Sequence, residues 1–233
     1  MPVALLTGAS KGFGRAVAAE LARRGWTLIV DARDPGALAE AAATLDGDGH
    51  TALPGDVTDP AHRAALAAAV ERAGRLDLLL HNASDLGPSP LPHLADLPVD
   101  AFRRVLEVNA VAPLALTQLL LPALAASGGE LVTVSSDAAV EAYEGWGGYG
   151  ASKAALDQLT AVLAAELPAL RVYALDPGDM RTAMHQAAFP GEDISDRAEP
   201  ETVVPALLRL VDERPPSGRY TAASLLVPAG SDA

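Results

Sequence analysis

The chain has 233 residues, half of them hydrophobic but only 4% aromatic, so its length suits one α/β domain with an aliphatic core. A formal net charge of −13 argues against nucleic acid or an anionic membrane surface as a partner, because both are negatively charged. There is no cysteine, which excludes a disulfide framework, a thiol nucleophile and a zinc–thiolate site.

Targeting signals and metal sites are not indicated either. The N-terminal segment has no basic region and its apolar run is short, which argues against a secretory signal. No apolar run approaches the ~20 residues needed to span a membrane, so we expect a cytoplasmic protein. The five histidines show no ligand spacing, and we expect no metal site.

Short apolar runs alternate with longer helical patterns along the chain. Strands are expected at Val3–Thr7, at Thr27–Val30, within 51–57, 75–84, 129–136 and 170–178, and in a short final run at 223–228. Helices are expected at 14–25, 34–45, 59–74, at Val99–Ala126 with a break near Pro113, at Tyr149–Leu167 and at Glu201–Asp212. This rhythm predicts a single Rossmann-like α/β domain over residues 1–233, with a doubly wound, seven-stranded parallel sheet flanked by helices.

A glycine-rich turn, TGASKGFG, joins the first predicted strand to the first helix. Gly8 permits a tight turn, Gly12 lets the backbone approach a pyrophosphate, and Gly14 lets helix and strand pack closely. The spacing G-x-x-x-G-x-G is weak evidence alone, but its position between an apolar strand and an amphipathic helix predicts a dinucleotide site.

The end of the second predicted strand bears on the type of cofactor. An acid there binds the adenosine ribose 2′-hydroxyl, whereas an arginine accommodates a 2′-phosphate. Asp31, Ala32 and Arg33 are all within range, and strand alternation puts Asp31 and Arg33 on one face. Lys11 adds a second cation beside the glycine turn, so the sequence favours NADP(H) over NAD(H), with Asp31 as the counter-evidence.

Tyr149 and Lys153 lie four residues apart on a predicted helix and therefore share a face. A tyrosine hydroxyl has an ordinary pKa near 10, too high for efficient proton transfer at neutral pH, and a nearby ammonium lowers that pKa. The pair can give a proton to a carbonyl oxygen, or take one from an alcohol, while a hydride moves to or from the cofactor.

Together these motifs resemble the short-chain dehydrogenase/reductase family over about Val3–Thr182. The resemblance implies an NAD(P)-dependent enzyme that interconverts a carbonyl compound and a secondary alcohol. It also implies a homodimer or homotetramer with the helix Tyr149–Leu167 at an interface. The positions similar to the family's cofactor contacts are Gly8, Ser10, Lys11, Gly12, Phe13, Gly14, Arg33, Asp56, Val57, Asn82, Ala83, Tyr149, Lys153, Pro177, Gly178 and Thr182.

The resemblance also implies catalytic roles. Tyr149 is the general acid/base, and Lys153 binds the nicotinamide ribose and lowers the tyrosine pKa. Ser136 falls where the family's catalytic serine does, thirteen residues before the tyrosine, although the neighbouring Ser135 competes for the role. Asn109 falls at the position of the asparagine that holds a water of the proton relay.

The chain departs from the family after the fourth predicted strand. The family usually has Asn-Asn-Ala-Gly there, and this chain has His81-Asn82-Ala83-Ser84. His81 changes a structural hydrogen-bonding position. Ser84 puts a side chain where glycine lets the backbone approach the cofactor ribose.

Residues 179–200 interrupt the strand–helix rhythm with a polar segment, and we expect a substrate lid there. Lid residues that face the nicotinamide, or that merely pack, are Met180, Met184, His185 and Phe189. Residues near the catalytic serine and tyrosine that line a substrate pocket, or belong to a solvated loop, are Asp137, Glu141, Tyr143 and Glu144. Trp146, three residues before Tyr149, either stacks on a substrate or simply packs.

Two other functions are compatible with parts of this pattern. A non-catalytic dinucleotide-binding redox sensor or scaffold would share the glycine turn, but it would not need Ser136, Tyr149 and Lys153. A nucleotide-sugar epimerase shares Tyr-x-x-x-Lys, but 233 residues leave little room for its usual substrate domain.

Overall fold

The computed structural model describes residues 1–227, and its strands form one parallel sheet in the order β3-β2-β1-β4-β5-β6-β7. The predicted seven-stranded parallel sheet is therefore confirmed. Its strands are β1 (Val3–Leu6), β2 (Thr27–Ala32), β3 (Thr51–Pro54), β4 (Leu78–His81), β5 (Glu130–Val134), β6 (Arg171–Asp176) and β7 (Gly218–Thr221).

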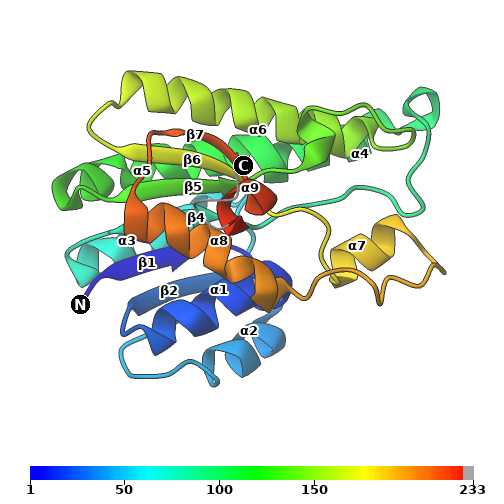
Figure 1. Ribbon diagram of the computed structural model, residues 1–233. Helices are drawn as coiled ribbons and strands as arrows, with labels where there is room; N and C mark the ends of the chain where they lie inside the picture. Colours follow the sequence, from blue (N-terminus) through cyan, green and yellow to red (C-terminus); the bar gives the residue numbers. More distant parts are fainter. Residues whose placement is uncertain (228–233) are drawn as a thin grey trace.

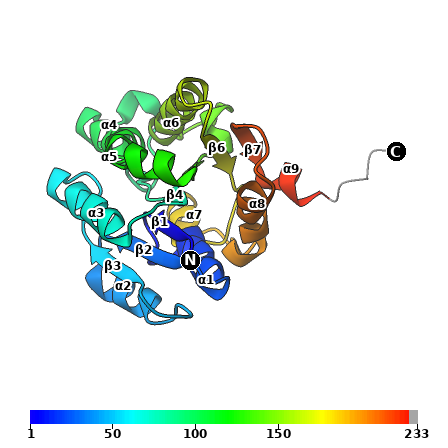
Figure 2. The same ribbon diagram turned by 90° about the vertical axis from the view of Figure 1, so that its left-hand side faces the viewer.

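Helices cover both faces of the sheet. Figure 2 shows α3, α5 and α6 on one side of the strands and α1 and α8 on the other. The helices are α1 (Gly12–Arg23), α2 (Pro35–Ala42), α3 (Pro60–Ala73), α4 (Val99–Leu106), α5 (Ala112–Ser127), α6 (Gly147–Glu166), α7 (Ala183–Ala188), α8 (Pro200–Glu213) and α9 (Ala222–Leu226). Figure 1 shows α7 apart from both layers, beyond the carboxyl ends of the strands.

Strand alternation divides the aliphatic core into two layers. In β1, Ala4 and Leu6 pack in the cluster that includes α1 and α8, whereas Val3 and Leu5 pack in the cluster that includes α3 and α5. Central strands are buried on both faces, which is why their sequences are continuously apolar.

Helix starts follow ordinary capping chemistry. The Asp34 carboxylate accepts hydrogen bonds from the amides of Gly36 and Ala37, and the Asp59 carboxylate accepts one from Ala61, as predicted for α3. Pro35 and Pro60 each occupy a first-turn position, where a missing amide proton costs nothing.

The predicted final strand at 223–228 is wrong. The seventh strand lies earlier, at Gly218–Thr221, and the apolar run that follows forms α9, while Pro228 falls outside the described residues. The Thr221 hydroxyl accepts a hydrogen bond from the Ser224 amide at 3.1 Å, and this cap starts a helix where the apolar run suggested a strand.

The long helical region breaks just before Pro113, as predicted, but by a change of helix type rather than a bend. Residues Glu107–Val111 form a π turn, and Pro113 sits in the first turn of α5. The whole segment Val99–Ser127 is long and apolar enough to cross a membrane, so the expectation that no such run exists is wrong. In the fold, Leu116, Leu120 and Leu124 of this segment are buried in the core beside α3.

His81, at the end of β4, is linked to α5. Its Nε2 lies 2.8 Å from the Thr117 hydroxyl, and both side chains are buried. Burial lowers the pKa of His81 to about 3, because the imidazolium would lose its hydration there. The replacement of asparagine thus keeps a strand-to-helix hydrogen bond, made with a neutral imidazole.

This depressed pKa predicts acid sensitivity. Between pH 6.5 and about 3 the unfolded chain binds a proton at His81 and the folded chain does not, so the free energy of unfolding falls as pH falls. We expect His81→Gln to reduce that slope by about 1.4 kcal/mol per pH unit, measured by urea unfolding at pH 7 and pH 5. The exposed His93→Gln is the control, and equal slopes in the two variants would contradict the prediction.

Candidate active site

A cavity of about 350 Å³ lies at the carboxyl ends of the strands, between the glycine turn, α6 and α7. Predicted site residues from distant parts of the chain line it: Gly8, Ser10, Lys11, Gly12, Phe13, Arg33, Asp56, Val57, Asn82, Ala83, Ser136, Tyr149, Lys153, Pro177, Gly178 and Thr182. Two predicted residues, Gly14 and Asn109, are not part of this lining and lie behind it.

The glycine turn is shaped by close packing against the end of β4. Gly8 has a φ of 67°, and a Cβ there would lie 2.8 Å from the Ala83 Cα. A Cβ on Gly14 would lie 2.4 Å from the Asn82 side-chain nitrogen and 2.6 Å from the Gly8 carbonyl oxygen. Gly12 also has a positive φ of 54°, and its open side faces the Thr182 methyl group. The turn can therefore present backbone to a phosphate, which fits a dinucleotide.

Asp31 is turned toward the protein. One carboxylate oxygen accepts a hydrogen bond from the Gly8 amide at 2.9 Å, and the other lies 3.0 Å from the His62 Nε2. Burial raises the pKa of Asp31, and the contacts with His62 and Gly8 oppose that rise. Both oxygens are thus engaged by the chain itself, while the side chains of Arg33 and Lys11 are exposed at the cavity.

Asp56 is also held by protein groups. It forms a 2.7 Å ion pair with Arg104 and accepts hydrogen bonds from the amide and hydroxyl of Thr58. Burial raises the pKa of Asp56, but these hydrogen bonds outweigh it and lower the pKa to about 2. Asp56 is consequently a fixed anion at the edge of the cavity, with the Arg104 cation beside it.

Tyr149 and Lys153 project from α6 into the cavity. The Lys153 ammonium donates a 2.7 Å hydrogen bond to the Val134 carbonyl and lies 5.6 Å from the centre of the Tyr149 ring. Burial lowers the pKa of Lys153 to about 8, and Asp157 opposes that change. The ammonium form therefore predominates at neutral pH.

The expected lowering of the tyrosine pKa is wrong for the protein alone. Burial raises the pKa of Tyr149 to about 12, and the neighbouring Ser84 and Ser136 hydroxyls oppose the rise. The Lys153 ammonium is directed at the Val134 carbonyl rather than at the phenol oxygen. Tyr149 is thus a neutral proton donor in this arrangement.

The two neighbouring serines have different surroundings. Ser135 is buried and its hydroxyl donates to an Asp157 carboxylate oxygen at 2.8 Å, on the side away from the tyrosine. Ser136 caps the short turn Asp137–Ala139, its hydroxyl donates to Asp137 at 3.0 Å, and the same hydroxyl is close enough to Tyr149 to lower the pKa of the phenol. Ser136, not Ser135, is the serine next to the tyrosine hydroxyl.

Asn109 lies in the π turn, and its side chain has no free hydrogen-bonding position. Its oxygen accepts from the Asp85 amide at 2.7 Å and the Ser84 hydroxyl at 3.2 Å. Its nitrogen donates to the Asp85 carbonyl and the Ser152 hydroxyl. Pro113, four residues after Asn109, has no amide proton, so the Asn109 main-chain carbonyl lacks the i+4 hydrogen bond that an α-helix would give it.

A charged cluster that no sequence motif indicates lies behind Ser136. Arg219 of β7 contacts the Asp157 carboxylate at 3.0 Å and the Asp176 carboxylate at 2.9 Å, and it donates to the Ser136 carbonyl. These residues come from three separate elements, and no local motif connects them. Only the β6–β7 pairing brings Arg219 to this edge of the sheet.

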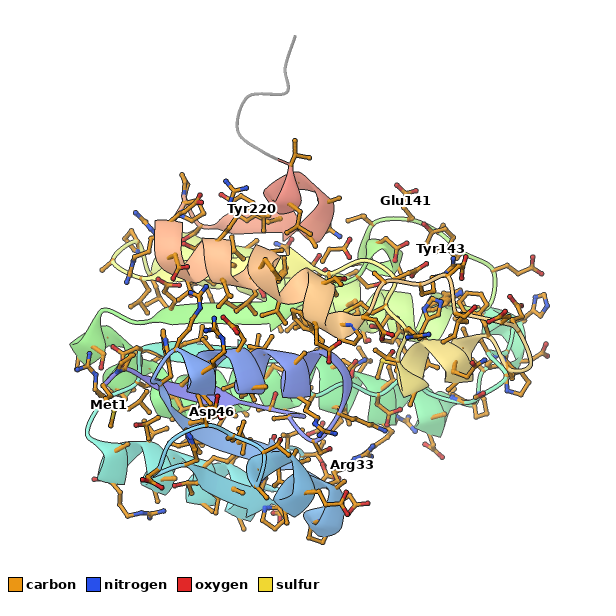
Figure 3. The ribbon with its side chains drawn as sticks, turned by 60° about the horizontal axis from the view of Figure 1, so that its bottom comes forward. Met1, Arg33, Asp46, Glu141, Tyr143 and Tyr220 are labelled. Atoms are coloured by element: carbon orange, nitrogen blue, oxygen red, sulfur yellow. The ribbon has the colours of Figure 1, made fainter. Side chains whose placement is uncertain are left out.

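The predicted lid and loop residues divide into three groups. Met180, Met184 and His185 line the cavity, as do Trp146 and Asp137. Phe189 packs behind them, 4.9 Å from the His185 ring and 5.9 Å from the Trp146 ring. The remaining residues, Glu141, Tyr143 and Glu144, are exposed, and Figure 3 shows Glu141 and Tyr143 at the surface. In residues 1–227, no group of three or more side chains could hold a metal ion.

The geometry indicates an oxidoreductase, because a glycine turn suited to a dinucleotide shares one cavity with the buried Tyr149 and Lys153 and the half-buried Ser136. The sequence model of the short chain dehydrogenases matches residues 2–193, and the chain belongs to this family of NAD(P)-dependent enzymes. The uncharacterized oxidoreductase YciK of Escherichia coli is 35% identical over 224 residues, 91% of this chain and 86% of YciK.

Solved structures of the family are similar over nearly the whole chain. A short chain dehydrogenase from Shigella flexneri complexed with NADP superimposes with a TM-score of 0.90 at 34% identity, covering 95% of this chain and 97% of that one. A second, from Escherichia coli CFT073 complexed with NADPH, gives a TM-score of 0.87 at 34% identity, covering 95% and 96%.

The charge of Arg219, in the cluster behind Ser136, should affect the pH dependence of the reaction. The Asp157 carboxylate already raises the pKa of Lys153, and the Asp176 carboxylate already raises the pKa of Tyr149. Without the Arg219 cation to neutralise them, both carboxylates would raise these pKa values further. We expect Arg219→Gln to shift the pH profile of alcohol oxidation upward by roughly 0.5–1 pH unit.

The matched control is Arg103→Gln, which removes an exposed arginine paired only with Asp100. An Arg219→Gln profile that overlies the Arg103→Gln profile would show that Arg219 has no electrostatic effect on the site.

Proposed function

We propose that the chain is an NADP(H)-dependent oxidoreductase that interconverts a carbonyl compound and a secondary alcohol. One observation carries the proposal: Tyr149, Lys153 and Ser136 meet in the cavity that continues from the glycine turn. A redox sensor would have no need of a buried proton donor there, so the enzyme is favoured over the sensor or scaffold.

The preference for NADP(H) rests on charge and on geometry. Lys11 and Arg33 offer two exposed cations at the cavity, which suit a 2′-phosphate. The anion that would favour a 2′-hydroxyl, Asp31, is engaged by Gly8 and His62. Figure 3 shows Arg33 projecting at the same end of the molecule as Tyr143, opposite Met1. Two similar structures that carry NADP or NADPH support the same choice.

The nicotinamide of the cofactor supplies or accepts the hydride at the substrate carbon. The chain's own part is to hold and move a proton. Ser136 holds the substrate oxygen beside Tyr149, and the neutral Tyr149 hydroxyl donates its proton to that oxygen as the C–H bond forms. The Lys153 ammonium and the Asn109 carbonyl then connect the tyrosine oxygen to solvent, from which it regains a proton. Alcohol oxidation follows the same path in reverse.

Other parts of the proposal concern assembly, location and the lid. The exposed side of α5 and α6 carries apolar side chains, with Leu119 50% and Val162 41% exposed, which suits a homodimer or homotetramer built on these helices. We further propose a cytoplasmic location. Residues 179–200, including α7, would serve as the substrate lid of one catalytic domain over 1–233.

The first test removes the proton donor. Tyr149→Phe should retain NADPH binding, because the ring and its packing remain, and lose turnover by about 10²–10⁴-fold. NADPH fluorescence measures binding, and a panel of ketones, aldehydes and quinones measures reduction. Tyr143→Phe, an exposed tyrosine outside the cavity, is the matched control. Undiminished reduction by Tyr149→Phe would make the mechanism wrong and favour another proton donor.

The second test concerns the cofactor. Arg33→Ala and Lys11→Ala should each weaken NADPH binding by about tenfold, because each removes a cation near the 2′-phosphate, and leave NADH binding within about twofold. Fluorescence titration with both cofactors measures the ratio. Arg15→Ala, an exposed arginine of α1 outside the cavity, is the control. Tighter NADH than NADPH binding by the unaltered protein would overturn the preference.

A further inference from the structure

The substrate end of the cavity has an apolar wall built on aromatic side chains. The Trp146 ring lies 5.7 Å from the Tyr149 ring in an edge-to-face arrangement and 5.9 Å from the Phe189 ring. Leu86 and Met184 belong to the same cluster and also line the cavity. Trp146 is half-buried, so part of its surface faces the space beside the catalytic hydroxyl. A flat apolar group of a substrate would be stabilised there, both by the burial of its apolar surface and by its contacts with the aromatic rings.

Carboxylates outnumber cations at this end of the cavity. Three carboxylates line it, from Asp137, Asp176 and Asp179. Asp176 is paired with Arg219 at 2.9 Å, and Asp179 lies 3.5 Å from Arg197. The Lys153 ammonium also lines this end, where it donates to the Val134 carbonyl. The lining cations Lys11, Arg33 and Arg104 belong instead to the cofactor end, in the glycine turn, directly after β2 and in α4.

Asp137 is the carboxylate without a cation. Its contacts are the Ser136 hydroxyl at 3.0 Å, the Ala138 amide at 2.8 Å and the Tyr143 hydroxyl at 3.0 Å, and no ion pair within 4 Å includes it among residues 1–227. It lies next in sequence to the serine that would hold the substrate oxygen. A substrate that carries a carboxylate beside the reacting carbonyl would therefore be repelled at short range by the Asp137 carboxylate, which no ion pair neutralises.

Resting on the proposed function, we propose that the substrate is an uncharged carbonyl compound with an aromatic or other flat apolar group, and that Trp146 and Asp137 select it. Trp146 binds the apolar group. Asp137 repels carbonyl compounds that carry a carboxylate next to the reacting carbon, such as 2-oxo acids.

The test compares methyl benzoylformate with benzoylformate, which differ in the charge beside one ketone. In a Trp26→Phe background Trp146 is the one remaining tryptophan, so its fluorescence in protein loaded with NADP⁺, which cannot reduce a ketone, reports binding without turnover. We expect the ester to bind at least about tenfold tighter and to be reduced with a higher kcat/KM, and the preference to shrink at high salt. Asp137→Asn should reduce the binding ratio to about threefold or less.

Glu141→Gln removes the same charge from an exposed position of the same loop outside the cavity, and it should leave the ratio unchanged. Trp146→Ala, read by reduction kinetics, should raise KM for the ester by about tenfold with a smaller effect on an aliphatic ketone such as 2-butanone. Equal binding of ester and acid, or a ratio that Asp137→Asn leaves unchanged, would overturn the inference. Selective binding without reduction of any carbonyl would support the inference and defeat the proposed function.

Discussion

A small hydrogen-bonded brace joins the ends of β1 and β4, and the rest of the site depends on it. The Thr7 hydroxyl accepts from the amides of Asn82 and Ala83 at 3.0 Å, while the Asn82 side chain donates to the carbonyls of Thr7 and Gly8. Chain connections leave the sheet in opposite directions at these two strands, β1 toward β2 and β4 toward β5. A crevice opens at such a switch point, and the brace fixes its width and the path of the glycine turn through it.

Burial sets the protonation states around this crevice more strongly than the neighbouring charges do. It makes His81 a neutral hydrogen-bonding group, holds Tyr149 in its protonated form and brings the Lys153 pKa to about 8. A donor tyrosine beside a partly titratable lysine suits carbonyl reduction. For the reverse reaction the phenol must lose its proton, and positive charge nearby favours that loss. The Lys153 ammonium, 5.6 Å from the centre of the Tyr149 ring, keeps its charge while it donates to the Val134 carbonyl and so acts in this direction against burial.

The sheet, the helix layers and the residues at the carboxyl ends of the strands could be predicted from the sequence. The periodic spacing of hydrophobic residues and the spacing of glycines are local signals, and these features depend on them. The sequence could not orient Asp31, whose role depends on His62 from α3, or find Arg219, whose partners come from α6 and β6. Asn109 is a further example. The sequence shows an asparagine in an apolar helix, but it does not show that the loop at Asp85 hydrogen-bonds both the oxygen and the nitrogen of its side chain. The misplaced last strand has a local cause, since a five-residue apolar run fits a strand or a helix and the Thr221 cap decides.

Ser84 shows how a departure from a family pattern becomes part of the site. Its hydroxyl donates to Asn109 at 3.2 Å, and the same hydroxyl opposes the rise in the Tyr149 pKa that burial causes, so it lies between the asparagine of the π turn and the phenol. A glycine at this position would leave the Asn109 oxygen with the Asp85 amide as its remaining donor. The serine thus gives the tyrosine a second hydroxyl neighbour besides Ser136. The single proton of Ser84 is directed at Asn109 and that of Ser136 at Asp137, so both hydroxyls turn lone pairs rather than protons to their other neighbours. Such surroundings suit a neutral phenol, which has a proton to give and needs no donor of its own.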